Sequence, residues 1–310
     1  MIWILWISLI IIGIIFFILL VTSLMIFFFA MKAKSPWNQD KKPWVPQIND
    51  PQLKERAIKS IGWFGSEGKL VFINAKDGTK LSGKIFLKDN ATHNIILFHG
   101  YRGKPEGDFC LIHDWLKDEK VNIISIYERG VYPSGGKYIT LGVKESDDVK
   151  SWTEYVSKLN KLPIILWGMS MGTASILYSL REPTNKRVTG IVADCGFTSI
   201  YEQYFNQTAE YSGRVLAKFF LFLAGFWCHL FLHFGFKVYD TRKILAKNKI
   251  PIFFVHGKAD KFVMPYFTEE NYNANKSEKS ILLVKDAGHM DSFKIAPEAY
   301  KKEVRKLLKK

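Results

Sequence analysis

Three residues, far apart in the chain, have the types and order of a nucleophile, an acid and a base. Ser170 is the centre of a Gly-x-Ser-x-Gly motif between an apolar run and an amphipathic segment. A strand, sharp turn and helix in that order lift a serine hydroxyl above a sheet, where it can attack a carbonyl. Asp260 and His289 each follow a later apolar run by five residues, the runs ending at Val255 and Val284. This order and placement predict a Ser-His-Asp catalytic triad.

The same chemistry needs two backbone N–H groups to stabilise the oxyanion that forms when a carbonyl is attacked. One expected donor is the N–H of Met171, directly after the serine. The second is expected in the loop that follows the third strand, where we predict the N–H of Tyr101. His99 precedes it, and we expect this side chain to shape the loop rather than to react.

The elements that must position these residues follow from the hydrophobic pattern. Two alternating segments flank Asp77-Gly78, a strong hairpin signal, and short apolar runs then alternate with amphipathic segments. That alternation is typical of a mostly parallel sheet covered by helices on both faces. The predicted hairpin is 70–75 and 81–87, the later strands are 94–98, 121–127, 163–167, 188–193, 251–255 and 281–284, and the helices are 107–117, 143–159, 171–181, 265–275 and 297–308.

Residues 68–310 resemble the α/β-hydrolase superfamily of serine hydrolases, in particular its membrane-anchored and fluorophosphonate-binding members. Besides the serine motif, the resemblance rests on five short segments, which are 98–103, 128–130 with 134–136, 194–199, 256–260 and 288–289. Glu128-Arg129-Gly130 departs from the usual Asp-x-Arg-Gly and leaves the local ion pairing open. The resemblance implies hydrolysis of an ester, thioester or amide without a cofactor.

The first 31 residues form a hydrophobic segment distinct from the hydrolase-like region. They carry no ionisable side chain, and 27 of the 31 are apolar. As a helix they would be about 46 Å long, more than the roughly 30 Å hydrocarbon core of a bilayer. No basic residue precedes them, which disfavours a cleaved signal peptide. We therefore predict a transmembrane anchor at 1–31, a proline-containing juxtamembrane linker at 32–67 with an extended spacer from Ser35 to Pro51, and a hydrolase domain at 68–310.

The net charge of +15 does not indicate a nucleic-acid-binding protein. Residues 32–62 contribute +4 (seven basic, three acidic) and residues 301–310 contribute +5 (six basic, one acidic). No nucleic-acid-binding motif accompanies the charge, whereas basic residues beside a span are attracted to anionic lipid headgroups. Because these residues follow the span, the positive-inside rule predicts a single-pass membrane protein with a cytoplasmic domain.

A second apolar stretch, residues 219–236, is long enough to suggest another span. A span there would separate Ser170 from Asp260 and His289 by a bilayer, so we reject it. In the α/β-hydrolases that this chain resembles, a lid is inserted at this position, and we predict a helical lid over about residues 200–245. Its aromatic residues would face an acyl pocket, the bilayer surface or a second copy of the chain. The candidates for substrate binding are Phe219, Phe222, Phe226 and Trp227.

Other reactive residue types are not expected to do chemistry. Cys110, Cys195 and Cys228 form no Cys-x-x-Cys pair and are predicted to be buried thiols. His229 and His233 share a helix face but lack a third ligand, so no metal is predicted. We thus expect a membrane-anchored, cofactor-free serine hydrolase that cleaves small-molecule or lipid acyl esters. An amidase or peptidase, or a non-catalytic binding module on the same fold, are the alternatives.

Overall fold

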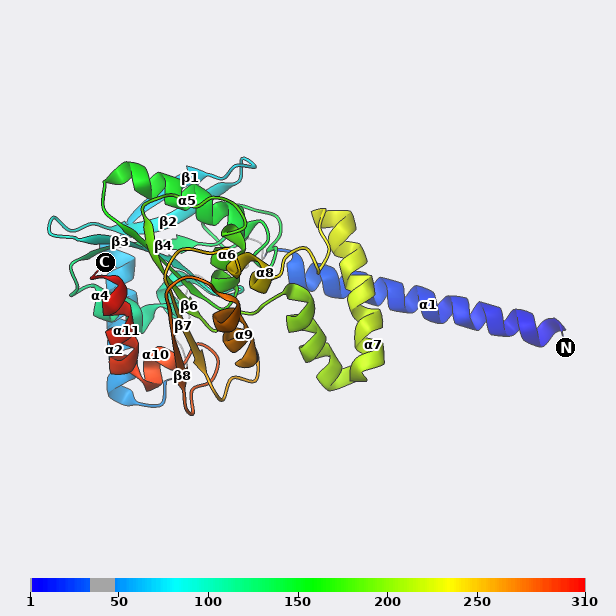
Figure 1. The fold of residues 1–310 in the computed structure, drawn as a ribbon. Coiled ribbons are helices and arrows are strands. Elements are labelled where there is room, and N and C mark those ends of the chain that lie inside the picture. The colour runs from blue at the N-terminus through cyan, green and yellow to red at the C-terminus, as the bar shows by residue number, and fades with distance from the viewer. Residues whose placement is uncertain (1, 34–47, 310) are drawn as a thin grey trace. The chain divides into compact units, whose positions relative to one another are not determined.

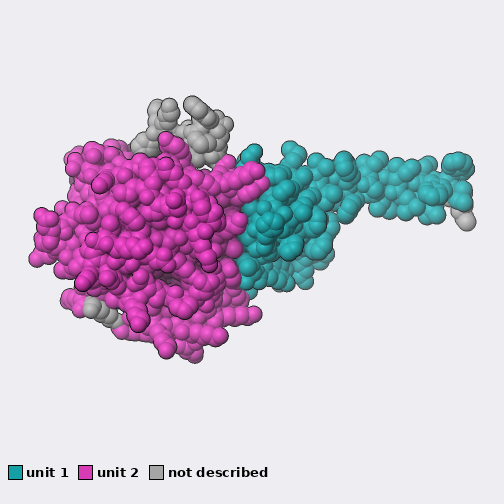
Figure 2. Space-filling model, turned by 90° about the horizontal axis from the view of Figure 1, so that it is seen from above, with its two compact units in different colours: residues 1–32, 200–238 teal, residues 33–199, 239–310 magenta. Residues whose placement is uncertain are grey.

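The structure, a computed structural model, describes residues 2–33 and 48–309. The chain divides into two compact units, which Figure 2 shows in different colours. One comprises residues 1–32 and 200–238, and the other, called here the hydrolase unit, comprises residues 33–199 and 239–310.

The hydrolase unit is built on an eight-stranded sheet in the order β1-β2-β4-β3-β5-β6-β7-β8. Pairing is antiparallel from β1 to β2 and from β2 to β4, and parallel between all later neighbours. The predicted hairpin and mostly parallel sheet are therefore confirmed. The strands are β1 (Lys69–Asn74), β2 (Lys80–Phe86), β3 (His93–Phe98), β4 (Val121–Tyr127), β5 (Ile164–Met169), β6 (Val188–Asp194), β7 (Ile252–Gly257) and β8 (Lys279–Val284).

Helices cover both faces of this sheet (Figure 1). Successive residues of a strand point to opposite faces, and from Ile95 to Phe98 of β3 both sets are apolar and buried. Ile95 and Leu97 belong to a buried cluster on one face, whereas Ile96 and Phe98 belong to the cluster on the other. A strand buried on both faces reads as a continuous apolar run. The helices of this unit are α2 (Pro51–Glu67), α3 (Pro105–Asp108), α4 (Cys110–Leu116), α5 (Glu145–Leu159), α6 (Met171–Ser179), α8 (Thr241–Leu245), α9 (Tyr266–Ala274), α10 (Ser292–Ile295) and α11 (Pro297–Leu307).

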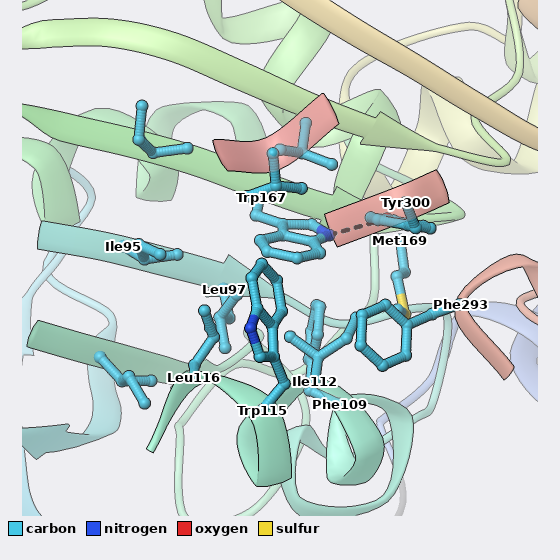
Figure 3. Close-up of a cluster of buried hydrophobic side chains, with 14 of the residues drawn as sticks. Ile95, Leu97, Phe109, Ile112, Trp115, Leu116, Trp167, Met169, Phe293 and Tyr300 are labelled. Carbon is cyan, nitrogen blue, oxygen red and sulfur yellow. Dashed lines mark hydrogen bonds between the residues drawn. The ribbon is translucent and has the colours of Figure 1, made fainter. Parts of the chain in front are cut away.

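The first of these clusters is rich in aromatic residues (Figure 3). Trp167 of β5 stacks on Tyr300 of α11 at a ring-centroid distance of 5.6 Å and donates its indole N–H to the tyrosine hydroxyl over 3.2 Å. The Tyr300 hydroxyl in turn donates to Asp194 at the end of β6, over 2.9 Å. This chain of contacts ties the C-terminal helix to the two strands that flank the serine motif.

Helix α2 differs from the linker that the sequence predicted over residues 32–67. Asp50 caps its N-terminus by accepting hydrogen bonds from two backbone N–H groups, and Pro51 occupies the first turn, where a proline needs no donor. Arg56 of the helix pairs with Asp114 of α4 at 2.6 Å. The helix is thus part of the hydrolase unit. The predicted extended spacer from Ser35 to Pro51 falls largely outside the described residues.

In the segment Glu128-Arg129-Gly130, the arginine is ion-paired and the glutamate is buried. Arg129 donates two hydrogen bonds to the buried carboxylate of Asp148, at 2.7 and 2.6 Å, and a third to Asp77 at 2.8 Å. Glu128 is 1% exposed, and neither oxygen has a hydrogen-bond partner among the described residues. Burial, with Glu145 and Asp148 nearby, raises its pKa well above the ordinary value.

The other unit consists of helix α1 (Ile2–Met31) and helix α7 (Ile200–Leu232). Both are long and apolar enough to cross a membrane. Gly213 interrupts α7 with a non-helical backbone (φ 76°, ψ 161°), which divides it into segments 200–212 and 214–232. Residues 200–238 of the predicted lid fall in this unit, whereas α8 falls in the hydrolase unit.

Candidate active site

Ser170 lies in a sharp turn between β5 and α6. Its backbone has φ 53° and ψ −116°, a conformation that non-glycine residues rarely adopt. Gly172 permits the turn, because a Cβ there would lie 2.0 Å from the carbonyl oxygen of Phe98. The Ser170 N–H donates to the Asp194 carbonyl over 2.9 Å. The predicted strand, turn and helix are therefore present, and the turn is hydrogen-bonded to β6.

The structure brings the three predicted triad residues together. The Ser170 hydroxyl lies 3.0 Å from His289 Nε2, and His289 Nδ1 lies 2.6 Å from Asp260 Oδ2. Because an ionised carboxylate only accepts, Nδ1 carries the imidazole proton. Nε2 is then left as an acceptor for the serine O–H. This is the arrangement in which a histidine can remove a proton from a serine.

Asp260 is held more firmly than the sequence suggested. Its Oδ1 accepts the backbone N–H groups of Phe262 and Val263 at 2.8 and 2.9 Å, and His256 Nε2 lies 3.0 Å from Oδ2. Burial alone would raise the pKa of Asp260, but hydrogen bonds from His256, His289 and the backbone outweigh it. The pKa is therefore well below its ordinary value, and the carboxylate is ionised throughout the neutral range.

His256 is a site residue that the sequence analysis missed. Its Nε2 contacts both Asp260 Oδ2 and the Val263 carbonyl oxygen, at 3.0 and 2.9 Å, and its Nδ1 lies 2.7 Å from the Thr268 hydroxyl. A carbonyl oxygen only accepts, so Nε2 carries the proton and donates to both oxygens. His256 lies near the end of β7, four residues before Asp260, and this spacing was the available signal.

The predicted oxyanion donors follow β3 and β5, which are neighbouring strands at the centre of the sheet. β4 lies on one side of β3 and β5 on the other, and the register pairs Phe98 with Gly168. The loop after β3 therefore approaches Ser170, and a Cβ on Gly100 would lie 3.5 Å from the serine Cβ. Tyr101 follows in this loop, and Met171 opens α6, where the first N–H groups have no acceptor within the helix. Their role as oxyanion donors stays a prediction.

His99 and Asp108 fix the backbone of that loop. His99 Nε2 accepts the Glu128 N–H at 2.9 Å, so its other nitrogen, Nδ1, carries the proton and donates to the Gly100 carbonyl at 2.7 Å. Burial lowers the pKa of His99 to about 4, which keeps it neutral. Asp108 Oδ2 accepts the Gly100 N–H at 2.9 Å. Burial raises the pKa of Asp108 to about 7, against the lowering effects of this bond and of His289. No local motif marks Asp108 in the sequence.

One further prediction concerns substrate-binding side chains. The predicted substrate-binding residues Phe219, Phe222, Phe226 and Trp227 belong to the unit of α1 and α7, and their role stays a prediction. In the hydrolase unit, Phe262 lies with its ring centroid 5.0 Å from that of His289 and is 53% exposed. It is an apolar side chain beside the base that the sequence analysis did not identify.

The remaining candidate residues behave as structural groups. The three cysteines are free and buried, as predicted. Within residues 2–33 and 48–309, no group of three histidine, cysteine or acidic side chains could hold a metal ion.

Comparison with known proteins agrees with this architecture. No family profile matches the chain. The uncharacterised protein YfhR of Escherichia coli K12 is 28% identical over 231 residues, which cover 72% of this chain and 74% of YfhR. The esterase Pf2001 of Pyrococcus furiosus superposes with a TM-score of 0.63 at 24% identity, over 86% of this chain and 97% of the esterase. The α/β-hydrolase GrgF of a Penicillium species superposes with a TM-score of 0.57 at 16% identity, over 78% and 98%.

These similarities agree with the mostly parallel eight-stranded sheet of this chain. The predicted fold class is confirmed: this chain has the α/β-hydrolase fold.

Proposed function

We propose that this protein is a membrane-anchored serine hydrolase that cleaves carboxylic esters through an acyl-enzyme. The observation that carries the proposal is the hydrogen-bonded series from Ser170 through His289 to Asp260, at the carboxyl end of the sheet. The fold shared with the esterase Pf2001 supports it. A fold alone does not determine activity, so the geometry of the side chains has the greater weight.

In the first half of the reaction, Ser170 Oγ attacks the acyl carbonyl while His289 Nε2 takes the hydroxyl proton. The imidazolium that forms is stabilised by Asp260, which also fixes the ring orientation. The N–H groups of Tyr101 and Met171 stabilise the oxyanion, together with the positive end of the α6 dipole. As the tetrahedral intermediate collapses, the C–O bond to the alcohol breaks, and His289 returns its proton to the departing oxygen.

In the second half, water attacks the acyl-enzyme. His289 accepts one proton of the water, the same N–H groups stabilise the second oxyanion, and the Ser170–acyl bond breaks. The proton returns to the serine oxygen, and the carboxylic acid leaves. The overall reaction consumes one ester and one water and needs no cofactor.

The anchor directs the choice of substrate class. Every residue of α1 from Ile2 to Ile18 is exposed and almost all are apolar, which favours insertion into a bilayer. An enzyme held at a membrane meets lipid and other acyl esters at the surface, and we infer that these are its substrates. Basic residues follow α1 closely, so by the positive-inside rule we infer a cytoplasmic hydrolase unit. Protease treatment of intact cells tests this orientation, because loss of the domain would contradict it.

The test of the activity is hydrolysis by the full chain in detergent. We expect turnover of p-nitrophenyl esters from acetate to palmitate and a Ser170→Ala variant with no activity above background. Preference for a p-nitroanilide would favour the amidase alternative. No turnover of either class, by a protein that unfolds cooperatively, would favour a non-catalytic binding module.

A further inference from the structure

The unit formed by α1 and α7 has exposed apolar surface on both helices. On α7 it includes Phe222, Phe226 and Leu230, which are 71%, 48% and 52% exposed and recur every four residues, so they form one stripe. On α1, beyond the segment up to Ile18, Met25 and Phe29 are 68% and 81% exposed. Exposed apolar patches of this kind mark sites of interaction with a partner or a membrane.

Side chains of the two helices contact each other near the C-terminal end of α1. Trp227 of α7 is 8% exposed and donates its indole N–H to Ser23 Oγ over 2.9 Å. Phe231 lies against Phe27 and Phe28, with ring-centroid distances of 5.4 and 5.1 Å. At this contact the second segment of α7 crosses α1 steeply instead of running alongside it (Figure 1).

The position of this crossing matches the edge of a membrane. Residues 2–22 of α1, which precede the contact at Ser23, would span about 32 Å as a helix, close to the roughly 30 Å hydrocarbon core. A helix that crosses a spanning helix steeply at its end lies roughly parallel to the membrane surface. Trp227 would then be at the depth where tryptophan is enriched in membrane proteins.

Charge also favours lipid as the occupant of the exposed stripe. Arg214 and Lys218 lie in the first turns of this segment and are exposed, where they can reach anionic headgroups. Residues 219–228 contain no charged side chain, and neither do residues 1–31 of the neighbouring helix. The apolar surface of α7 therefore lies beside the uncharged surface of α1, which we infer to be embedded in a bilayer.

We propose that residues 214–232 form an interfacial helix. It crosses the end of α1 and lies parallel to the bilayer surface, with Phe222, Phe226 and Leu230 inserted among lipid acyl chains. The proposal rests on α1 being a membrane span, as in the proposed function. It assigns the second apolar helix to the bilayer surface without a second crossing, and it commits these side chains to lipid instead of substrate.

The experiment places nitroxide spin labels on single cysteines in the full chain, reconstituted in vesicles of phosphatidylcholine and phosphatidylglycerol. The sites are Phe222→Cys and Phe226→Cys, with Ile14→Cys as a control in α1 and Leu87→Cys as an exposed apolar control in the hydrolase unit. The three native thiols are buried, so the unsubstituted protein serves as the blank. Circular dichroism and thermal unfolding check that each variant folds.

Power saturation then compares exposure to oxygen, which enters lipid, with exposure to a water-soluble nickel complex. We expect positions 222, 226 and 14 to be several-fold more accessible to oxygen than to nickel, and position 87 to show the reverse. Labels at 222 and 226 that behave like position 87, with position 14 in lipid, would overturn the interfacial helix and leave the anchor intact. Exclusion of both reagents from 222 and 226 would overturn it in favour of a second copy or bound substrate. Nickel access at position 14 would contradict the anchor itself.

Discussion

On each side of Ser170 an aspartate supports the site, and the pKa values of the two carboxyl groups are shifted in opposite directions. After β7, Asp260 accepts hydrogen bonds from two histidines and two backbone N–H groups, and its pKa is well below the ordinary value. After β3, Asp108 accepts a bond from the Gly100 N–H, and burial raises its pKa to about 7. Burial opposes ionisation of both carboxyl groups. Asp260, which accepts more hydrogen bonds, therefore has the lower pKa.

This contrast separates two tasks. The acid–base side needs a permanent negative charge opposite the imidazolium of His289. The oxyanion side needs an ordered loop, and a permanent negative charge beside the developing oxyanion would oppose the reaction. The following substitutions test each side, beginning with the largest expected effect.

His289→Ala removes the base and should lower kcat for a p-nitrophenyl ester on the order of 10⁶-fold, because a serine hydroxyl without a base is a poor nucleophile. Residual turnover should equal that of Ser170→Ala, since the two residues act as one unit. Steady-state kinetics on protein of unchanged thermal stability checks this. A His289→Ala variant within tenfold of the parent would exclude His289 as the base.

Asp260→Asn should lower kcat on the order of 10⁴-fold, because an amide can donate to His289 Nδ1 and favour the wrong tautomer. The matched control is Asp286→Asn, the same substitution at an exposed position three residues before His289, for which we expect kcat within twofold of the parent. Equal effects of the two substitutions would contradict the special role of Asp260.

His256→Phe removes one of the two histidine donors to Asp260 and should lower kcat about tenfold with KM unchanged. The aspartate keeps its bonds from His289 and the backbone, so the loss should be far smaller than for Asp260→Asn. The partners left behind, the Thr268 hydroxyl and the Val263 carbonyl, should reduce the free energy of unfolding by about 1–3 kcal/mol. A change in KM without a change in kcat would show that His256 does not position Asp260.

Asp108→Asn should change the pH dependence of stability. The folded-state pKa of about 7 exceeds the unfolded value near 3.8, so between these pH values the native state binds more protons than the unfolded state. The contribution of Asp108 to stability is therefore present at low pH and is lost as pH rises through 7. The asparagine lacks this titration, so its stability relative to the parent should rise by about 2 kcal/mol from pH 4 to pH 8, allowing for partial exposure. Denaturant titrations at both pH values measure it, and a constant difference would contradict the raised pKa.

The sequence predicted the site residues that follow a recognisable strand. It missed the residues that only the folded chain brings next to the triad or to the loop after β3. Ser170, Asp260 and His289 could be placed because each follows a strand, and the strands read as apolar runs. Asp108 is brought to the site by the folding of the loop after β3, which no local pattern records, and for His256 the only local signal is its spacing of four residues from Asp260. The predicted linker was also extended too far, to residue 67, because Asp50-Pro51 begins helix α2. The break at Gly213 was missed because both flanking segments read as helix.

The most direct measurement is the location of a fluorophosphonate adduct on the full chain. The reagent reacts with a serine that has been activated by a base, and digestion with mass spectrometry identifies the modified residue. The proposed mechanism predicts one adduct on the peptide that contains Ser170, absent from Ser170→Ala and strongly reduced in His289→Ala. Undiminished labelling of Ser170→Ala, or an adduct on another serine, would contradict it.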